Sequence, residues 1–144
     1  MIIAVISHKN VTELEEVESM FIFSSVDEFS VLRKSIKEEL AQISGKDAQR
    51  IFIAINEGVN NAIFHGNKAD NRKKVYLTME KLLDELKIVI RDEGDGFCYA
   101  ETSSARSGFE EHGRGFEIIQ HCMDSYQVNR VGNEITLIKK INTA

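Results

Sequence analysis

The spacing of apolar residues changes along the chain from a helical period to a strand period, and this change narrows the possible folds most. Two stretches carry apolar residues three and four positions apart: Phe29, Leu32, Ile36, Leu40 and Ile43, then Ile51, Ile55, Val59 and Ile63. Asp27 is the predicted N-cap of the first helix and Gly45 its stop signal. The second helix is predicted from about Asp47 to Phe64. The chain therefore contains two consecutive amphipathic helices.

Alternating apolar and polar residues predict strands on both sides of these helices. A short strand is expected at 19–25, a hairpin at 73–94, a third helix from Gly113 through Met123, and a closing hairpin at 125–141. Residues 93–112 lack periodicity, and a loop of that length usually forms a lid or a binding loop. This order predicts an α/β (α+β) two-layer sandwich, in which three helices cover one face of a mixed, mostly antiparallel sheet.

Length and composition are those of one soluble globular domain. The chain has 144 residues, of which 42% are hydrophobic and 28% charged, so we expect a single domain over 1–144. Residues 1–18 form an extra N-terminal segment, in which IIAVI is compatible with one more strand and TELEEVE with a solvated helix or loop. MIIAVIS is too short to span a membrane and lacks the features of a secretion signal, which predicts a cytoplasmic protein.

Charge and cysteine content exclude several classes of ligand. A net charge of -5 and a pI near 5.4 leave no general basic field for nucleic acid or an anionic membrane, so protein or small-molecule partners are favoured. The two cysteines, Cys98 and Cys122, suit a reducing compartment with free thiols. Together with His112 and His121 they lack the spacing of a zinc site.

The helical stretch INEGVNNAIFHG, residues 55–66, has an unusual polar face. Glu57, Asn61 and His65 recur at intervals of four, so a regular helix aligns them roughly opposite the apolar stripe. The face has no Lys or Arg, and Gly58 lowers helix propensity by ~1 kcal/mol relative to Ala. Both features are explained by a binding site that uses an acid and an amide oxygen and lets a ligand approach the helix closely. An ordinary exposed polar face is the alternative.

The motif RDEGDGF, residues 91–97, comes at the end of an apolar strand. Asp92 can accept a hydrogen bond from the amino group of a flat heterocycle, while Gly94 and Gly96 permit close approach of the backbone. Asp and Gly also dominate ordinary turns, so an acidic turn is the alternative.

The motif HGRGFEII, residues 112–119, lies at the predicted start of the third helix. Gly113 and Gly115 would expose free amide groups there, and the helix dipole adds about half a positive charge. This arrangement predicts an anion site, although a loop that simply meets a helix can carry the same residues.

Together, the three motifs resemble the N, G1 and G2 boxes of the GHKL (Bergerat-fold) ATPase superfamily, over roughly residues 19–141. Within that superfamily, the chain is similar to the anti-sigma-factor serine kinases of bacterial partner-switching systems. The resemblance implies a histidine-kinase-like ATPase domain with the Bergerat-type ATP-binding fold, and ATP and Mg²⁺ as its cofactors.

The resemblance also implies roles for individual residues. Glu57 matches the general base, Asn61 the amide that ligates Mg²⁺, and Asp92 the acid that reads adenine. The other matches to nucleotide-binding positions are His65, Gly94, Gly96, Gly113, Arg114, Gly115, Phe116 and Thr136. Arg33 matches a contact with a partner protein, and Arg106 in the lid is a candidate phosphate ligand.

The implied function is transfer of the γ-phosphoryl group of ATP to a serine of a small STAS-domain anti-anti-sigma protein, combined with sequestration of a sigma factor. Relatives imply a homodimer, and neither nucleic acid nor a membrane is an expected direct partner. Two alternatives remain open: a nucleotide-dependent module that sequesters its partner without catalysis, and a switch kinase that activates a downstream phosphatase. Glu57 favours catalysis over pure binding, because binding alone needs no base.

Overall fold

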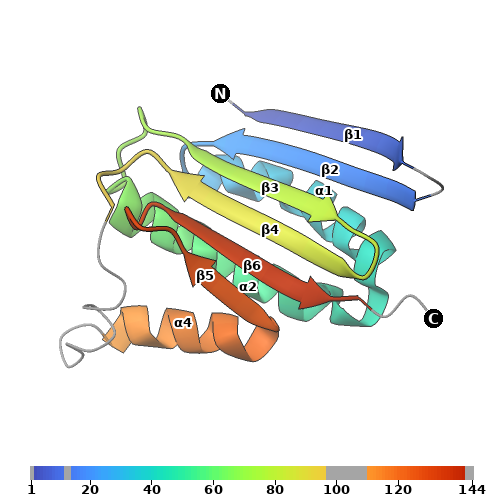
Figure 1. The fold of residues 1–144 in the computed structure, drawn as a ribbon. Coiled ribbons are helices and arrows are strands. Elements are labelled where there is room, and N and C mark those ends of the chain that lie inside the picture. The colour runs from blue at the N-terminus through green and yellow to red at the C-terminus, as the bar shows by residue number, and fades with distance from the viewer. Residues whose placement is uncertain (1, 12–13, 97–109, 142–144) are drawn as a thin grey trace.

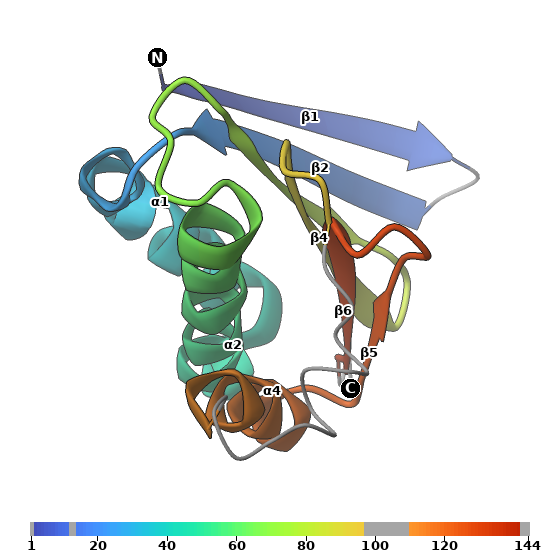
Figure 2. The same ribbon diagram turned by 90° about the vertical axis from the view of Figure 1, so that its left-hand side faces the viewer.

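The structure is a computed structural model that describes residues 2–11, 14–96 and 110–141. One layer is a six-stranded sheet with the strand order β1-β2-β3-β4-β6-β5 (Figure 1). The helices form the second layer on one face of this sheet, as the edge-on view shows (Figure 2). The predicted two-layer α+β sandwich is therefore confirmed. All pairs among the described strands are antiparallel, so the sheet is more uniform than the mixed sheet that the sequence predicts.

The strands are β1 (Ile3–Val11), β2 (Leu14–Phe23), β3 (Val75–Lys81), β4 (Glu85–Asp92), β5 (Ser125–Val128) and β6 (Glu134–Lys140). The helical elements are α1 (Val26–Ser44), η1 (Gly45–Asp47), α2 (Ala48–Asn60), η2 (Asn61–Gly66) and α4 (Glu110–Cys122). Both predicted hairpins, β3–β4 and β5–β6, are present. Within the described ranges, none of the helices combines the length and the apolar character that crossing a bilayer requires.

The N-terminal segment belongs to the sheet. β1 pairs with β2 from Ile3↔Ile22 to Val11↔Leu14, so IIAVI adds a strand at the edge. The strand expected at 19–25 begins earlier, at Leu14, and most of TELEEVE is therefore strand rather than solvated helix or loop. The physical reason is that β1 supplies backbone hydrogen-bond partners that the local sequence cannot reveal.

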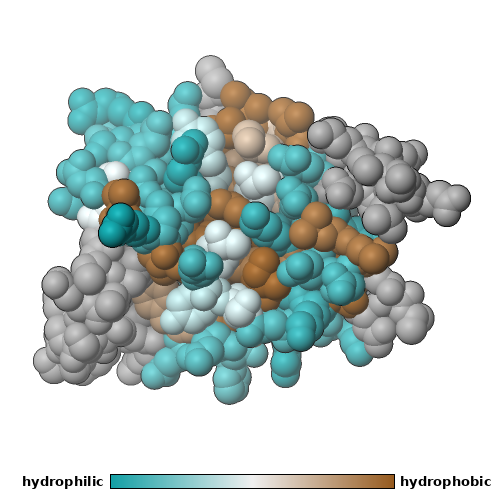
Figure 3. Space-filling model, viewed as in Figure 1, coloured by the Kyte–Doolittle hydropathy of each residue, from teal (hydrophilic) through white to brown (hydrophobic). Residues whose placement is uncertain are grey.

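The hydrophobic core lies between the sheet and the helices. Its central residues are Phe29, Leu32, Ile36 and Leu40 of α1, Ile51, Ile55 and Val59 of α2, and Leu77, Met79, Leu86, Ile88, Ile90, Ile135 and Leu137 of the strands. Both predicted helical stripes therefore face the sheet, and alternate strand residues point toward them. The other face of the sheet is uncovered and presents polar and apolar side chains side by side (Figure 3).

The first helix is capped by two side chains, Ser25 and Glu28. The Oγ of Ser25 accepts a hydrogen bond from the N–H of Glu28 at 3.1 Å, and the Glu28 carboxylate accepts one from the N–H of Ser24 at 2.7 Å. This second bond lowers the pKa of Glu28 below its ordinary value. The N-cap is thus Ser25 rather than the predicted Asp27, which lies in the first turn and favours the helix dipole. Gly45 ends the helix as predicted, with a φ of 49°.

Gly58 lies where α2 packs directly on β4. It is buried, and a Cβ atom at this position would lie 2.6 Å from Cδ1 of Ile90 on β4. The sequence pattern suggests that this glycine allows the close approach of a ligand. The structure corrects that interpretation, because the close approach is between α2 and β4.

We expect Gly58→Ala to lower the free energy of unfolding by about 1 kcal/mol, because overpacking costs ~1–3 kcal/mol and alanine regains ~1 kcal/mol of helix propensity. Ile90→Val removes the methyl group that the new Cβ would meet. In the Ile90→Val background, the same glycine substitution should therefore become neutral or stabilising. Urea unfolding of the four proteins measures this coupling, and strictly additive effects would contradict the contact.

Candidate active site

The polar helix face predicted from the sequence spans two kinds of helix. α2 is α-helical through Asn60, and η2, from Asn61, is π-helical, with the N–H of Asn67 bonded to the carbonyl of Ala62 at 2.8 Å. A π-helical segment widens the turn and is frequently found at functional sites. Glu57 and Asn61, one turn apart, remain neighbours. The predicted alignment of His65 with them rests on α-helical spacing, and η2 does not continue that spacing.

Glu57 and Asn61 face the backbone of α4. A Cβ atom on Gly115 would lie 3.5 Å from Oε2 of Glu57 and 3.6 Å from Nδ2 of Asn61. Both side chains are half-buried, and Gly115 is buried. The first and third sequence motifs, which lie about one third of the chain apart, therefore meet in space, and any side chain at position 115 would fill the space before the acid and the amide.

The third helix begins earlier than predicted. α4 starts at Glu110, so Gly113 and Gly115 lie within the helix rather than at its N-terminus. As a consequence, the N–H groups beyond the first turn are used within the helix. Gly113 and Arg114 belong to this helix, but the Arg114 side chain lies outside the described part of the structure.

Asp92 ends β4 as a buried carboxylate with an exposed fraction of 3%. Its Oδ1 accepts a hydrogen bond from the N–H of Gly94 at 2.8 Å, and its Oδ2 would lie 2.1 Å from a Cβ on Gly66. Burial raises the pKa of the Asp92 carboxyl group, because the charged form loses solvation. An ordinary acidic turn leaves its carboxylate in water, so this arrangement favours the interpretation of a binding site.

The two glycines after Asp92 are required by the backbone. A Cβ on Gly94 would lie 1.9 Å from the carbonyl oxygen of Gly66, so the loop after β4 packs directly on the end of η2. Gly96 has a φ of 85°, and a Cβ there would lie 2.0 Å from the carbonyl oxygen of Val131. The second motif is therefore held against η2 on one side and against the β5–β6 turn on the other.

Other predicted residues lie apart from this site. Thr136 is on the uncovered face of the sheet, where it lines a groove of about 610 Å³ with Lys87 and Gln127. Because Asp92 points to the helix side, the structure does not bring Thr136 together with it. Phe116 is buried and stacks on Tyr126 with a centroid distance of 5.7 Å, so its ring belongs to the packing between α4 and β5.

The remaining residues singled out from the sequence are Arg33, Arg106 and the two cysteines. The Arg33 guanidinium lies 5.9 Å from the ring centroid of Phe52, and its Nε is buried without a hydrogen-bond partner among the described residues. Cys122 is a half-buried free thiol on α4. Arg106 and Cys98 lie outside the described residues.

Local sequence patterns give no role to Gly66, Asn67 and Glu93, which hold the second motif in place. Asn67 is 1% exposed, and its Oδ1 accepts a hydrogen bond from the N–H of Glu93 at 2.8 Å. A Gly-Asn pair after a helix normally predicts a C-cap or a turn, so local sequence gives no signal that this amide reaches the residue after β4, 26 positions away.

Taken together, this fold and these motifs define a protein of one class. The chain belongs to the family of histidine kinase-like ATPase domains, whose family model matches residues 24–139. The match runs from the residues before α1 to the end of β6 and includes all three motifs, which confirms the predicted GHKL-type resemblance.

Among individual relatives, the chain is 31% identical over 121 residues to the anti-sigma F factor of Clostridium perfringens strain SM101, covering 77% of this chain and 86% of that protein. It is 30% identical over 119 residues to the anti-sigma F factor of Oceanobacillus iheyensis, covering 77% and 82%. It is 29% identical over 140 residues to the serine-protein kinase RsbW of Staphylococcus aureus strain JH9, covering 88% of both chains.

Proposed function

We propose that this chain is an ATP-dependent serine protein kinase and anti-sigma factor. One observation carries the proposal: the α2–η2 stretch contacts both other motifs, with Glu57 and Asn61 facing Gly115 and Gly66 facing Asp92. At one end of the stretch, the Asp92 carboxylate is available to bind a nucleobase. At the other end, Glu57 and Asn61 offer an acid and an amide. The relatives named anti-sigma F factor and serine-protein kinase RsbW support the same function.

ATP would bind along this stretch, with adenine at Asp92 and the phosphates at α4. The Asp92 carboxylate would accept a hydrogen bond from the amino group of adenine, while Gly94 and Gly96 let the loop after Asp92 pack against η2 and the β5–β6 turn. The residues proposed near the phosphates are Gly113, Arg114, Gly115 and Phe116. His65 is a proposed nucleotide contact nearer the adenine end, because its neighbour Gly66 packs on Asp92. Because α4 is helical from Glu110, phosphate binding by the amides of Gly113 to Phe116 requires that its first turns open.

Asn61 is the proposed protein ligand of Mg²⁺. Among the described residues, no group of three or more His, Cys, Asp or Glu side chains could hold a metal ion. Mg²⁺ commonly takes few protein ligands together with waters and phosphate oxygens, and the half-buried Asn61 amide beside the Gly115 backbone fits that pattern. Bound there, the ion would neutralise charge on the phosphate oxygens.

The chemical step would need positioning and one base. The Oγ of a partner serine forms a bond to the γ-phosphorus, and the bond from that phosphorus to the β–γ bridging oxygen breaks, so ADP leaves with the electron pair. Glu57 would accept the serine proton, which requires a distance of ~3 Å in the loaded complex.

The proposed partners are a STAS-domain anti-anti-sigma protein and a sigma factor, in a cytoplasmic protein without direct contact to nucleic acid or a membrane. Arg33, beside Phe52, is the proposed contact residue for these partners. We also propose a homodimer. Its support is the long edge strand β1, which pairs on one side with β2 and exposes 54% of Val5. Light scattering of the purified protein decides the oligomeric state.

The test of function incubates the protein with Mg-ATP and candidate STAS-domain proteins, followed by mass spectrometry of the partner. Phosphoserine on the partner supports the kinase. Tight ATP binding without transfer instead favours the non-catalytic sequestering module. A kinase that also stimulates a phosphatase in a reconstituted mixture would be the switch kinase. Absence of ATP binding would overturn the proposal.

We expect Asn61→Ala to weaken ATP binding in the presence of Mg²⁺ by about 10-fold or more, because the proposed protein ligand of the ion is lost. Binding measured with EDTA should change little. Titration calorimetry with and without Mg²⁺ gives both values. Asn60→Ala, the same change one residue earlier, is the control and should behave like the wild type. An unchanged Mg²⁺ effect in Asn61→Ala would remove the assignment.

A further inference from the structure

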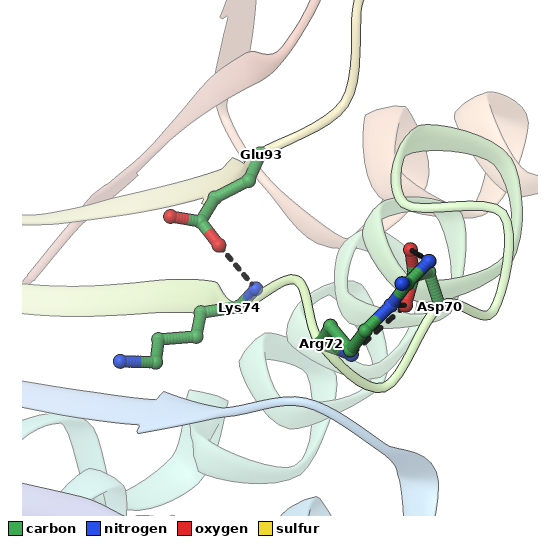
Figure 4. Close-up of polar contacts among 4 residues, drawn as sticks. All are labelled: Asp70, Arg72, Lys74 and Glu93. Carbon is green, nitrogen blue, oxygen red and sulfur yellow. Dashed lines mark hydrogen bonds and ion pairs between the residues drawn. The ribbon is translucent and has the colours of Figure 1, made fainter.

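Asn67 joins three separate parts of the chain through one buried amide. Its Nδ2 donates a hydrogen bond to the carbonyl of Lys74 at 3.0 Å, and its Oδ1 accepts one from the N–H of Glu93 at 2.8 Å. The Glu93 carboxylate in turn accepts a hydrogen bond from the N–H of Lys74 at 2.6 Å, which Figure 4 shows as a dashed line. Asn67, Lys74 and Glu93 thus form a closed ring of three hydrogen bonds, called here the Asn67 ring.

The Asn67 ring restrains Asp92 from two directions. Gly66, next to Asn67, packs so closely on Asp92 that a Cβ atom would lie 2.1 Å from Oδ2. Glu93, next to Asp92, has its N–H fixed by Asn67, so the peptide group that follows Asp92 is fixed as well. The Asp92 carboxylate therefore has little freedom to turn while the ring is intact.

Further contacts anchor the ring to the sheet and to η2. The hydroxyl of Tyr76 donates a hydrogen bond to the Glu93 carboxylate at 3.1 Å, and the Arg91 guanidinium lies 4.7 Å from the Tyr76 ring centroid. The N–H of Asn67 closes η2 on the carbonyl of Ala62 at 2.8 Å. Since both polar groups of the buried Asn67 side chain are satisfied, the network specifies one geometry rather than several.

We propose that Asn67 is a positioning residue that sets the preference of the site for adenine. The Asn67 ring holds the Asp92 carboxylate in the direction from which it accepts the exocyclic amino group of the base. Asn67 acts through Asp92 and has no contact of its own with the nucleotide. The inference rests on the proposed function, because it needs a site that reads adenine through Asp92.

The test compares the dissociation constants of ATP and purine riboside triphosphate, which lacks the 6-amino group. The wild type should prefer ATP by about 10-fold or more, because the analogue leaves the buried carboxylate without its partner. In Asn67→Ala this preference should fall below about threefold, while affinity for the analogue changes little. A purely structural role would instead weaken both nucleotides equally and leave the preference intact.

A matched control lies in the same loop. Asp70 bonds the Arg72 side chain at 3.0 and 3.1 Å, outside the Asn67 ring (Figure 4). Asp70→Ala should therefore keep the full preference for ATP. If Asn67→Ala does not fold, Glu93→Ala and Glu93→Gln decide, because only glutamine keeps an oxygen that can accept from the N–H of Lys74. The preference should fall in Glu93→Ala and be retained in Glu93→Gln.

The outcomes separate this inference from the proposed function. A wild type that binds neither triphosphate overturns both. A wild type that binds ATP and the analogue equally removes the adenine-reading role of Asp92, and the role of Asn67 falls with it. A wild type that prefers ATP, with the preference unchanged in Asn67→Ala, or in both Glu93 variants, overturns the inference alone.

Discussion

Replacing Glu57 by Gln is expected to lower the rate of phosphoryl transfer to the partner serine by about 10²–10⁴-fold, the range for loss of a positioned general base. Glutamine keeps the size of the side chain beside Gly115 but cannot take the proton. The dissociation constant for ATP should remain within about threefold of the wild type, because the base contributes little to ground-state binding. Single-turnover phosphorylation and calorimetry measure the two quantities separately.

Glu80→Gln is the control for this experiment. Glu80 lies on β3, next to the inward-pointing Met79, and points to the face of the sheet opposite the helices. The same chemical change there should leave the rate unaltered. Rapid phosphorylation by Glu57→Gln would show that another group takes the proton, whereas a parallel loss of ATP binding would show that Glu57 shapes the nucleotide site instead.

Replacing Asp92 by Asn is expected to separate binding from stability. Affinity for ATP should fall by about 10-fold or more, because a charged acceptor for the adenine amino group is lost. The free energy of unfolding at pH 7 should rise, since burial makes the ionised carboxylate costly and asparagine carries no charge. Asn still offers an oxygen to the N–H of Gly94. Calorimetry and urea unfolding measure the two effects.

The raised pKa of Asp92 also predicts how the gain in stability of Asp92→Asn depends on pH. Because the pKa of Asp92 is raised in the folded protein, the folded state holds the proton more tightly than the unfolded chain. The contribution of Asp92 to stability therefore falls as the pH rises from about 4, the ordinary pKa of an aspartate, through the raised value. The advantage of Asp92→Asn should shrink toward pH 4. A constant advantage would contradict the raised pKa.

Sequence periodicity predicts most of the fold correctly, because each helix and hairpin carries its own signal. The stripes from Phe29 to Leu40 and from Ile51 to Val59 face the sheet, and Gly45 ends α1 as expected. Errors occur where partners are distant in sequence. TELEEVE extends β2 because β1 lies beside it. The start of α4 at Glu110 rather than at Gly113 is a separate error, in the boundary of a correctly predicted helix.

The sequence likewise identifies some residues of the candidate site but not where others lie. The identity of Glu57, Asn61 and Asp92 as candidates follows from residue type and spacing alone. Thr136 could not be placed from the sequence alone, because a shift of one position along a strand reverses the direction of a side chain. Strand register places Thr136 on the face of the sheet opposite the helices. The role of Gly58 was also not predictable from the sequence, because its close neighbour is Ile90 of the sheet and not a ligand.

The amino-acid order by itself determined the class of fold, the family-like motifs and the chemical type of each main group, because these depend on local patterns. Only the tertiary structure decided that Gly115 faces Glu57 and Asn61, that Asp92 is buried against Gly66, and that Asn67 links η2 to β3 and β4. The physical reason is that close packing and burial arise from segments far apart in the chain, and no local pattern encodes which backbone will lie against which side chain.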